Sequence, residues 1–142
     1  MEGQQILQPV VVLAAWTMVM WLWMYATRIP AMQAAKVHPD NLVKDPEASL
    51  ERFLPPQVMW KAHNYNHLHE APTVFYAVAI VIALTGTGEG LNLWLAWAYV
   101  ALRIAHSLVQ ATINRVMVRF ALFAVSSLVL LALIVHAAIA VF

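Results

Sequence analysis

The chain has 142 residues, of which 63% are hydrophobic and 11% are charged, and its mean hydropathy is +0.71, which is outside the range of ordinary soluble domains. With about 20 residues per transmembrane helix, this length allows four spans and leaves no room for a large soluble domain. The absence of cysteine excludes disulfides, thiolate catalysis and cysteine-ligated metal or iron–sulfur centres, and the net charge of +1 gives no sign of a nucleic-acid partner.

The first half of the chain predicts two transmembrane helices. The first covers about residues 6–27 and is closed by "TRIP" at 27–30. Neither a basic segment before this run nor a small-residue cleavage site after it is present, so we expect a retained span and not a signal peptide. Residues 31–56 contain several prolines and mixed charges, which predicts a loop with room for a short surface helix. The second span covers about 57–85 and ends at the glycine-rich turn "TGTGEG".

The second half predicts two further spans. Residues 91–142 contain no glycine or proline, and as one helix they would reach about 78 Å, more than twice the ~30 Å of hydrocarbon in a bilayer. The chain must therefore turn, and the polar segment "QATINRVMVR" at 110–119 is the expected place. The resulting spans are about 91–112 and 117–140. Residues 1–142 are thus predicted to form a single all-α integral membrane domain, a four-transmembrane-helix bundle with up-down-up-down topology.

Basic residues predict the orientation of this bundle. All eight lysines and arginines lie in or beside the first and third loops, whereas the second loop and both tails have none. The positive-inside rule then places the first and third loops in the cytoplasm and both termini on the opposite side.

Two polar stripes are predicted near the cytoplasmic ends of the second and third helices. At 100° per residue, one face of the second helix gathers His63, Asn66, His67 and Glu70. One face of the third helix gathers a second set, and these residues are Arg103, His106, Ser107, Gln110 and Asn114. Ionisable groups within a span are costly and normally face a bundle interior or a wet cavity, so we expect the stripes to meet and to form a site. Pro72 is expected to kink the second helix just past Glu70.

Several of these residues have simpler interpretations. Lys61, Asn64 and His69 are expected among the lipid headgroups, and His136 is expected to be a packed or interfacial histidine. Glu70 and Arg103 are expected to form an ion pair inside the bundle, either as a structural contact or as a ligand clamp.

Three further interpretations concern metal, lipid and aromatic contacts. His63, His67 and Glu70 have the spacing of metal ligands on one helical face, although one helix supplies only part of a coordination sphere, and we expect no metal site. Arg115 and Arg119 can anchor their loop to phospholipid phosphates. The tryptophans are expected at the interfacial belt or in packing contacts.

Two segments carry a resemblance to a known family. "NHLHEAPTVFYAV" at 66–78 and "AWAYVALRIAHSLVQATINRVMVRFALF" at 96–123 resemble the MAPEG family, the membrane-associated proteins in eicosanoid and glutathione metabolism, and in particular its small bacterial members. The resemblance implies a homotrimer of four-helix subunits in a bacterial inner membrane, with the second helices at the inner contacts. It also implies a glutathione site between subunits near the cytoplasmic side, with Arg119 as the catalytic residue. The glutathione-binding residues implied are His63, Asn66, His67, Glu70, Arg103, His106, Gln110 and Arg115.

Departures from the family pattern occur in the same motifs. His67 stands in place of an asparagine, Asn66 and His63 in place of arginines, Gln110 in place of a tyrosine, and Phe120 where some members have a hydroxyl donor. Fewer guanidinium groups therefore face the two carboxylates of glutathione. Two functions follow. One is a glutathione-dependent transferase or peroxidase acting on lipophilic electrophiles that enter from the bilayer lipids. The alternative is a catalytically silent module that binds a lipid or a quinone-like molecule, or that serves as an accessory subunit of a larger membrane complex.

Overall fold

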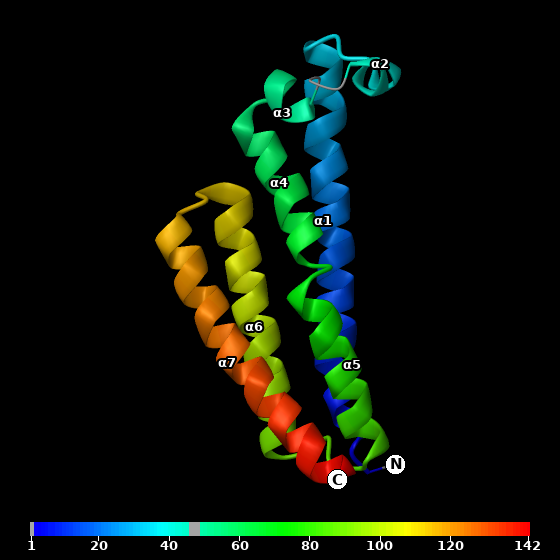
Figure 1. Cartoon of the computed structure of the whole chain (residues 1–142), viewed down its shortest axis with the longest axis vertical. Helices are drawn as coiled ribbons and strands as arrows, with labels where there is room; N and C mark the ends of the chain where they lie inside the picture. Colours follow the sequence, from blue (N-terminus) through cyan, green and yellow to red (C-terminus); the bar gives the residue numbers. More distant parts are fainter. Residues whose placement is uncertain (1, 46–48) are drawn as a thin grey trace.

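The computed structural model describes residues 2–45 and 49–142, and the regular secondary structure in these two ranges is entirely helical (Figure 1). The elements are η1 (Gln4–Ile6), α1 (Leu7–Ala34), α2 (Pro39–Lys44), α3 (Leu50–Phe53), α4 (Pro56–His67), α5 (Ala71–Leu84), α6 (Leu91–Thr112) and α7 (Val116–Val141). Three stretches are long and apolar enough to cross a membrane, namely Gln4–Ala34, Pro56–Leu84 and Val116–Val141. The all-helical fold is thus confirmed, whereas a membrane crossing by the 22-residue α6 stays a prediction.

The long helices form an elongated bundle (Figure 1). α1 packs along α4 and α5, α6 packs against α7, α4 and α1, and α7 packs against α6 and α5. Both termini and the 85–90 loop lie at one end, whereas α2 and α3 lie at the other end (Figure 1). This arrangement brings α4, α5, α6 and α7 together halfway along the molecule.

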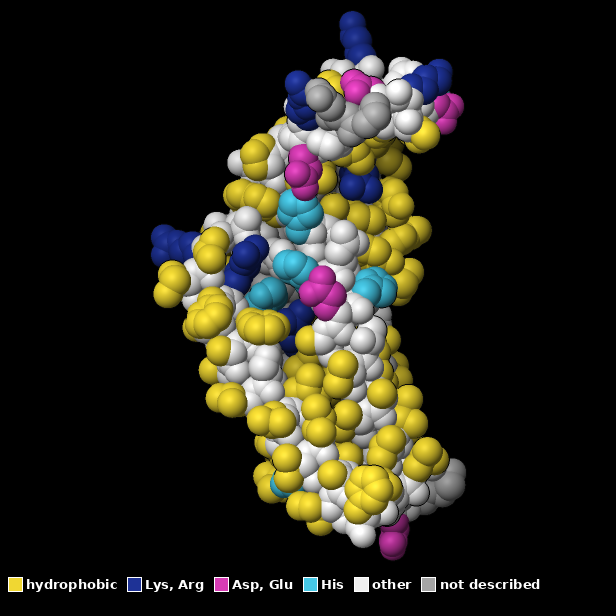
Figure 2. Space-filling view, in the orientation of Figure 1, with side chains coloured by type: hydrophobic (Ala, Val, Ile, Leu, Met, Phe, Trp, Pro, Cys, Tyr) yellow, Lys and Arg dark blue, Asp and Glu magenta, His cyan; other side chains and the backbone are white. Residues whose placement is uncertain are grey.

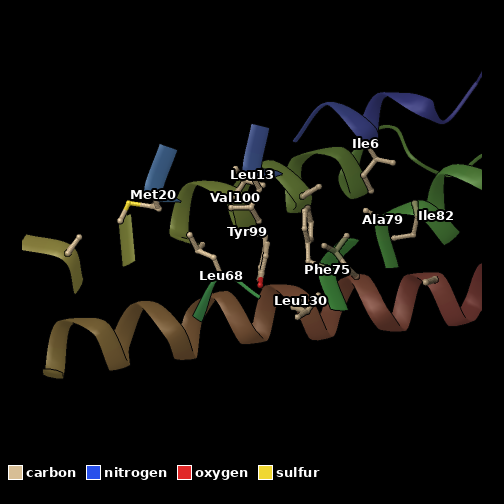
Figure 3. Packing of buried hydrophobic residues seen from close by; sticks show 14 residues of the cluster. Ile6, Leu13, Met20, Leu68, Phe75, Ala79, Ile82, Tyr99, Val100 and Leu130 are labelled. Carbon is tan, nitrogen blue, oxygen red and sulfur yellow. The ribbon is translucent and has the colours of Figure 1, made fainter. Parts of the chain in front are cut away.

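A stacked aromatic pair lies in the centre of the hydrophobic core (Figure 3). The rings of Phe75 and Tyr99 are 4.5 Å apart between centroids with an interplanar angle of 22°, which joins α5 to α6. Leu13 of α1 and Leu68 of the α4–α5 connection are both fully buried in the same cluster. The core therefore ties the helices together directly beside the polar residues of α6.

α1 extends further than its apolar sequence suggested. We expected the first helix to close at "TRIP", but Pro30 lies inside α1 and the helix continues to Ala34. At 1.5 Å per residue its 28 residues reach about 42 Å, so about 12 Å extends beyond a ~30 Å hydrocarbon layer. The chain then turns at Lys36, which has a left-handed backbone (φ 55°).

The second span is broken and not merely kinked. α4 ends at His67, and α5 begins at Ala71 after a non-helical Glu70 (φ −95°, ψ −102°). Pro72 has no N–H, and its ring would clash with the carbonyl of Leu68 if the helix continued, so it favours the start of a new helix. The break occupies residues 68–70, whereas a kink was expected just past Glu70, so the face calculated for Glu70 on a continuous helix does not apply.

A labelling experiment tests the orientation expected from the basic residues. Because the sequence has no cysteine, Lys44→Cys and Glu89→Cys each introduce a single thiol. These positions lie at opposite ends of the molecule, in α2 and in the 85–90 loop. In intact inverted and right-side-out vesicles, we expect an impermeant maleimide to reach the two thiols from opposite sides, with Lys44→Cys labelled from the cytoplasm. Labelling of both from one side would contradict this orientation.

Candidate functional site

A cavity of about 260 Å³ opens at the break between α4 and α5. Three parts of the chain line it: the α4–α5 connection, α6 and the first turns of α7. Figure 2 shows histidine, acidic and basic side chains gathered around a hollow halfway along the molecule. The lining residues are His67, Glu70, Ala71, Arg103, His106, Val116, Arg119, Phe120 and Phe123.

The polar stripe of α6 forms the inner wall of this region. Arg103, His106, Ser107 and Gln110 are all buried, because their spacing of three and four residues places them on the helix face that packs against α4. Gln110 Oε1 lies 3.0 Å from His67 Nδ1, and Arg103 donates a 3.4 Å hydrogen bond to the backbone oxygen of His67. Of the four residues predicted on the stripe of the second helix, His67 thus contacts the α6 stripe.

Three side-chain nitrogens of residues around the cavity lack hydrogen-bond partners. Among the described residues, no group accepts from Arg103 Nε or Arg119 Nε, and the buried His106 Nδ1 is likewise without a partner. A buried polar group without a hydrogen bond costs about 1–3 kcal/mol, and more if it is charged. Three such nitrogens around one cavity, two of them on guanidinium groups, favour the binding of an anionic ligand.

The expected ion pair between Glu70 and Arg103 is not formed. Glu70 is exposed, and within the described ranges its carboxylate has no ion pair or hydrogen bond. The physical reason is the helix break, which releases Glu70 from the face that α4 presents to α6. Both residues nevertheless line the cavity, so they offer opposite charges to one ligand.

α7 contributes one cation and an apolar wall. Arg119 donates a 2.6 Å hydrogen bond to Asn114 Oδ1, and Asn114 has the left-handed backbone (φ 47°) that ends α6. The apolar wall consists of Val116, Phe120 and Phe123, which lie on one face of α7 and are all exposed. One side of the cavity is therefore polar and buried, whereas the other is apolar and accessible.

Beside the cavity, a buried hydrogen-bonded node joins three helices. Ser107 Oγ accepts hydrogen bonds from Trp16 Nε1 of α1 (2.9 Å) and from Asn64 Nδ2 of α4 (2.5 Å). Asn64 is fully buried, so its expected place among the headgroups is wrong. The expectation rested on its polarity near the membrane interface, but α6 packs over this side of α4.

Other predicted site residues lie away from the cavity. His63 Nε2 is 2.9 Å from Glu51 Oε1 in α3, so it is not grouped with His67 and Glu70 as a metal site would require. Asn66 and Arg115 are exposed and do not line the cavity, whereas Gln110 lies behind His67. Throughout 2–45 and 49–142, no group of three or more histidine or acidic side chains is arranged to hold a metal ion.

Three histidine and lysine side chains outside the cavity were also predicted from the sequence, and their contacts and exposure test those predictions. Lys61 is half-buried and donates to the backbone oxygens of Gln57 and Ala111, with its amine 5.1 Å from the Trp23 ring centroid, so it is not simply a headgroup contact. His69 is exposed, as expected. His136 Nδ1 lies 2.6 Å from Asn92 Oδ1, which agrees with a packed histidine.

The apolar wall was not identified from the sequence, although a signal for it exists. Val116, Phe120 and Phe123 recur at i, i+4 and i+7, and Arg119 lies on the same side of the helix. This pattern was hidden because almost every face of α7 is apolar.

These features describe a helical membrane protein with a buried cationic cavity that has an apolar outer wall. The sequence model of the MAPEG family matches residues 6–139, so the chain belongs to this family and is an integral membrane protein. No curated protein and no solved structure gives a significant match to the chain.

Proposed function

We propose that this protein is a glutathione-dependent transferase or peroxidase whose thiol substrate binds in the cavity between α4, α5, α6 and α7. The observation that carries the proposal is that Arg103, His106 and Arg119, which line that cavity, each have a side-chain nitrogen without a partner. Membership of the MAPEG family supports glutathione as the anionic ligand.

The lining residues fit the charges of glutathione. Its two carboxylates accept hydrogen bonds from Arg103 and His106, each of which has a side-chain nitrogen without a partner in the free protein. The free carboxylate of Glu70 binds its ammonium group at the accessible edge of the cavity. Each contact replaces an unsatisfied or solvent-exposed charge with a charge-assisted hydrogen bond, which is worth about 1.5–3 kcal/mol.

The apolar wall admits the second substrate. Val116 and Phe120 are 64% and 63% exposed, so this side of the cavity faces outward, where the bilayer or a neighbouring subunit lies. A lipophilic electrophile partitions into the bilayer and reaches the cavity past these side chains, while the thiol enters from water. Arg119 lies beside this wall, and its positive charge stabilises the attacking sulfur as a thiolate.

The single chain forms only part of the site. A cavity of about 260 Å³ is smaller than the ~300–1,000 Å³ that is usual for small-molecule sites. In a homotrimer, a neighbouring subunit completes the pocket and leaves the apolar wall open to the bilayer. The site then lies near the cytoplasmic surface of a bacterial inner membrane.

A ligand-stabilisation experiment tests this function. In detergent-solubilised protein, glutathione at 100 times its Kd is expected to stabilise the fold by about 2.7 kcal/mol, measured as a rise in Tm. S-Methylglutathione keeps both carboxylates and should also stabilise, whereas the glutathione diester should not. Conjugation of glutathione to an aryl chloride then measures activity.

Two results would contradict the proposal. Equal stabilisation by the diester would show that the cationic groups do not recognise the ligand. The absence of any shift with glutathione would instead favour a silent module that binds a lipid or a quinone-like molecule, or that serves a larger membrane complex.

A further inference from the structure

We propose that His67 is the general base that removes the thiol proton, and that Gln110 is the residue that positions its imidazole ring. This inference rests on the proposed function, because it assigns a residue to the first chemical step of that reaction. It concerns two residues of this chain that contact each other across α4 and α6 at the wall of the cavity.

The contact between these side chains selects one tautomer of His67. Gln110 Oε1 lies 3.0 Å from His67 Nδ1, and an amide oxygen can only accept a hydrogen bond. Nδ1 therefore carries the proton, which leaves a lone pair on Nε2. Among the residues that the structure describes, none forms a hydrogen bond with Nε2, so this lone pair is free to accept a proton.

The backbone also holds the imidazole in place. His67 is the last residue of α4, and its carbonyl oxygen accepts from Arg103 Nη2 at 3.4 Å and from the amide of Glu70 at 3.2 Å. Gln110 is 1% exposed, so its amide has little freedom to move. The ring is thus fixed relative to α6 from two directions, as a pre-organised catalytic group requires.

The charges that share the cavity with His67 favour this step. Arg103 and Arg119 are cationic, His106 is a second imidazole, and Glu70 is the acidic group at the edge. The guanidinium group of Arg119 stabilises negative charge on sulfur, so it assists the departure of the thiol proton.

With an aryl chloride substrate, the reaction has three steps. The S–H proton moves to His67 Nε2, which gives a thiolate and an imidazolium. The sulfur lone pair forms a C–S bond with the ring carbon, and chloride leaves with the electrons of the C–Cl bond. The imidazolium then releases its proton to water, which restores the neutral ring.

His67→Gln tests the base directly, because glutamine keeps a polar side chain but cannot accept the proton. With glutathione bound at neutral pH, we expect the ultraviolet absorbance of the thiolate to be present in the wild type and lost in this variant. The kcat should fall by about 10²–10⁴-fold, whereas the Tm shift with S-methylglutathione should stay close to that of the wild type. The matched control is His69→Gln, since His69 is exposed and lies outside the cavity; this variant should keep both signals.

Two Gln110 variants test the positioning role in the unliganded protein. Gln110→Glu keeps an acceptor for Nδ1–H, whereas Gln110→Leu removes it. ¹⁵N NMR of histidine-labelled protein, with the His67 signal assigned by its absence in His67→Gln, should show the Nδ1–H tautomer in the wild type and in Gln110→Glu. Gln110→Leu should lose this preference and part of the thiolate signal.

The results separate this inference from the function on which it rests. If the wild type gives no shift with glutathione, the proposed function and the role of His67 both fall. If the wild type binds glutathione as a thiolate and His67→Gln does so equally, only the role of His67 falls. An unchanged tautomer in Gln110→Leu overturns the role of Gln110.

Discussion

Arg103→Met is expected to leave the unliganded protein as stable as the wild type, or more stable, and to abolish most of its affinity for glutathione. Arg103 is 3% exposed, donates one hydrogen bond of 3.4 Å, and has no ion pair within the described residues. Because a buried charge carries a desolvation cost that this single contact does not offset, replacement by an apolar side chain of similar length is expected to be neutral or stabilising.

The expected loss of binding is large. Removal of one partner from a buried, hydrogen-bonded charge pair costs about 2–5 kcal/mol, which corresponds to about 30-fold to more than 1,000-fold in Kd. Thermal unfolding measures the stability, and isothermal titration with glutathione measures the affinity. Arg115→Met is the matched control, since Arg115 is exposed and does not line the cavity.

A purely structural arginine would give the opposite result. If Arg103 served only to hold α6 against α4, its replacement would destabilise the protein by several kcal/mol and leave binding by the folded fraction unchanged. That outcome would remove Arg103 from the proposed ligand site.

Ser107→Ala is expected to cause the largest loss of stability among conservative substitutions on α6. Its hydroxyl accepts from Trp16 Nε1 and Asn64 Nδ2, and both donors would lose their partner inside the bundle. An interhelical hydrogen bond in a membrane protein is worth about 0.6 kcal/mol on average and up to about 1.7. The two together give an expected loss of about 1–3 kcal/mol in the free energy of unfolding.

Ser126→Ala provides the control for this substitution. Ser126 is also buried, but its hydroxyl donates to the carbonyl of Phe123 in its own helix. Removal of this hydroxyl should therefore lower the free energy of unfolding by much less than Ser107→Ala does. Unfolding by denaturant in mixed micelles measures both. Equal effects of the two substitutions would show that the node formed by Trp16, Asn64 and Ser107 does not hold α1, α4 and α6 together.

Local sequence patterns determined much of the architecture. The length and polarity of the apolar runs predicted the helices, and the bounds of α6 agree with the expected segment 91–112. A single helix over 91–142 would be much longer than a bilayer is thick, so a turn was expected in the polar segment 110–119, and it lies at 113–115. The stripe was predicted correctly from Arg103 to Gln110 because α6 is unbroken there, so the angle of 100° per residue holds, whereas Asn114 lies past the end of the helix.

The tertiary structure alone decided which groups face the cavity. On the second span, the break after His67 changes the phase of every later residue, so a helical wheel drawn through it misplaces Glu70 relative to Arg103. Asn64 is buried because α6 covers its side of α4, and His63 pairs with Glu51 because α3 lies beside it. Periodicity gives the face of a side chain on its own helix, whereas its burial and partners depend on the neighbouring helices, which are distant in the sequence.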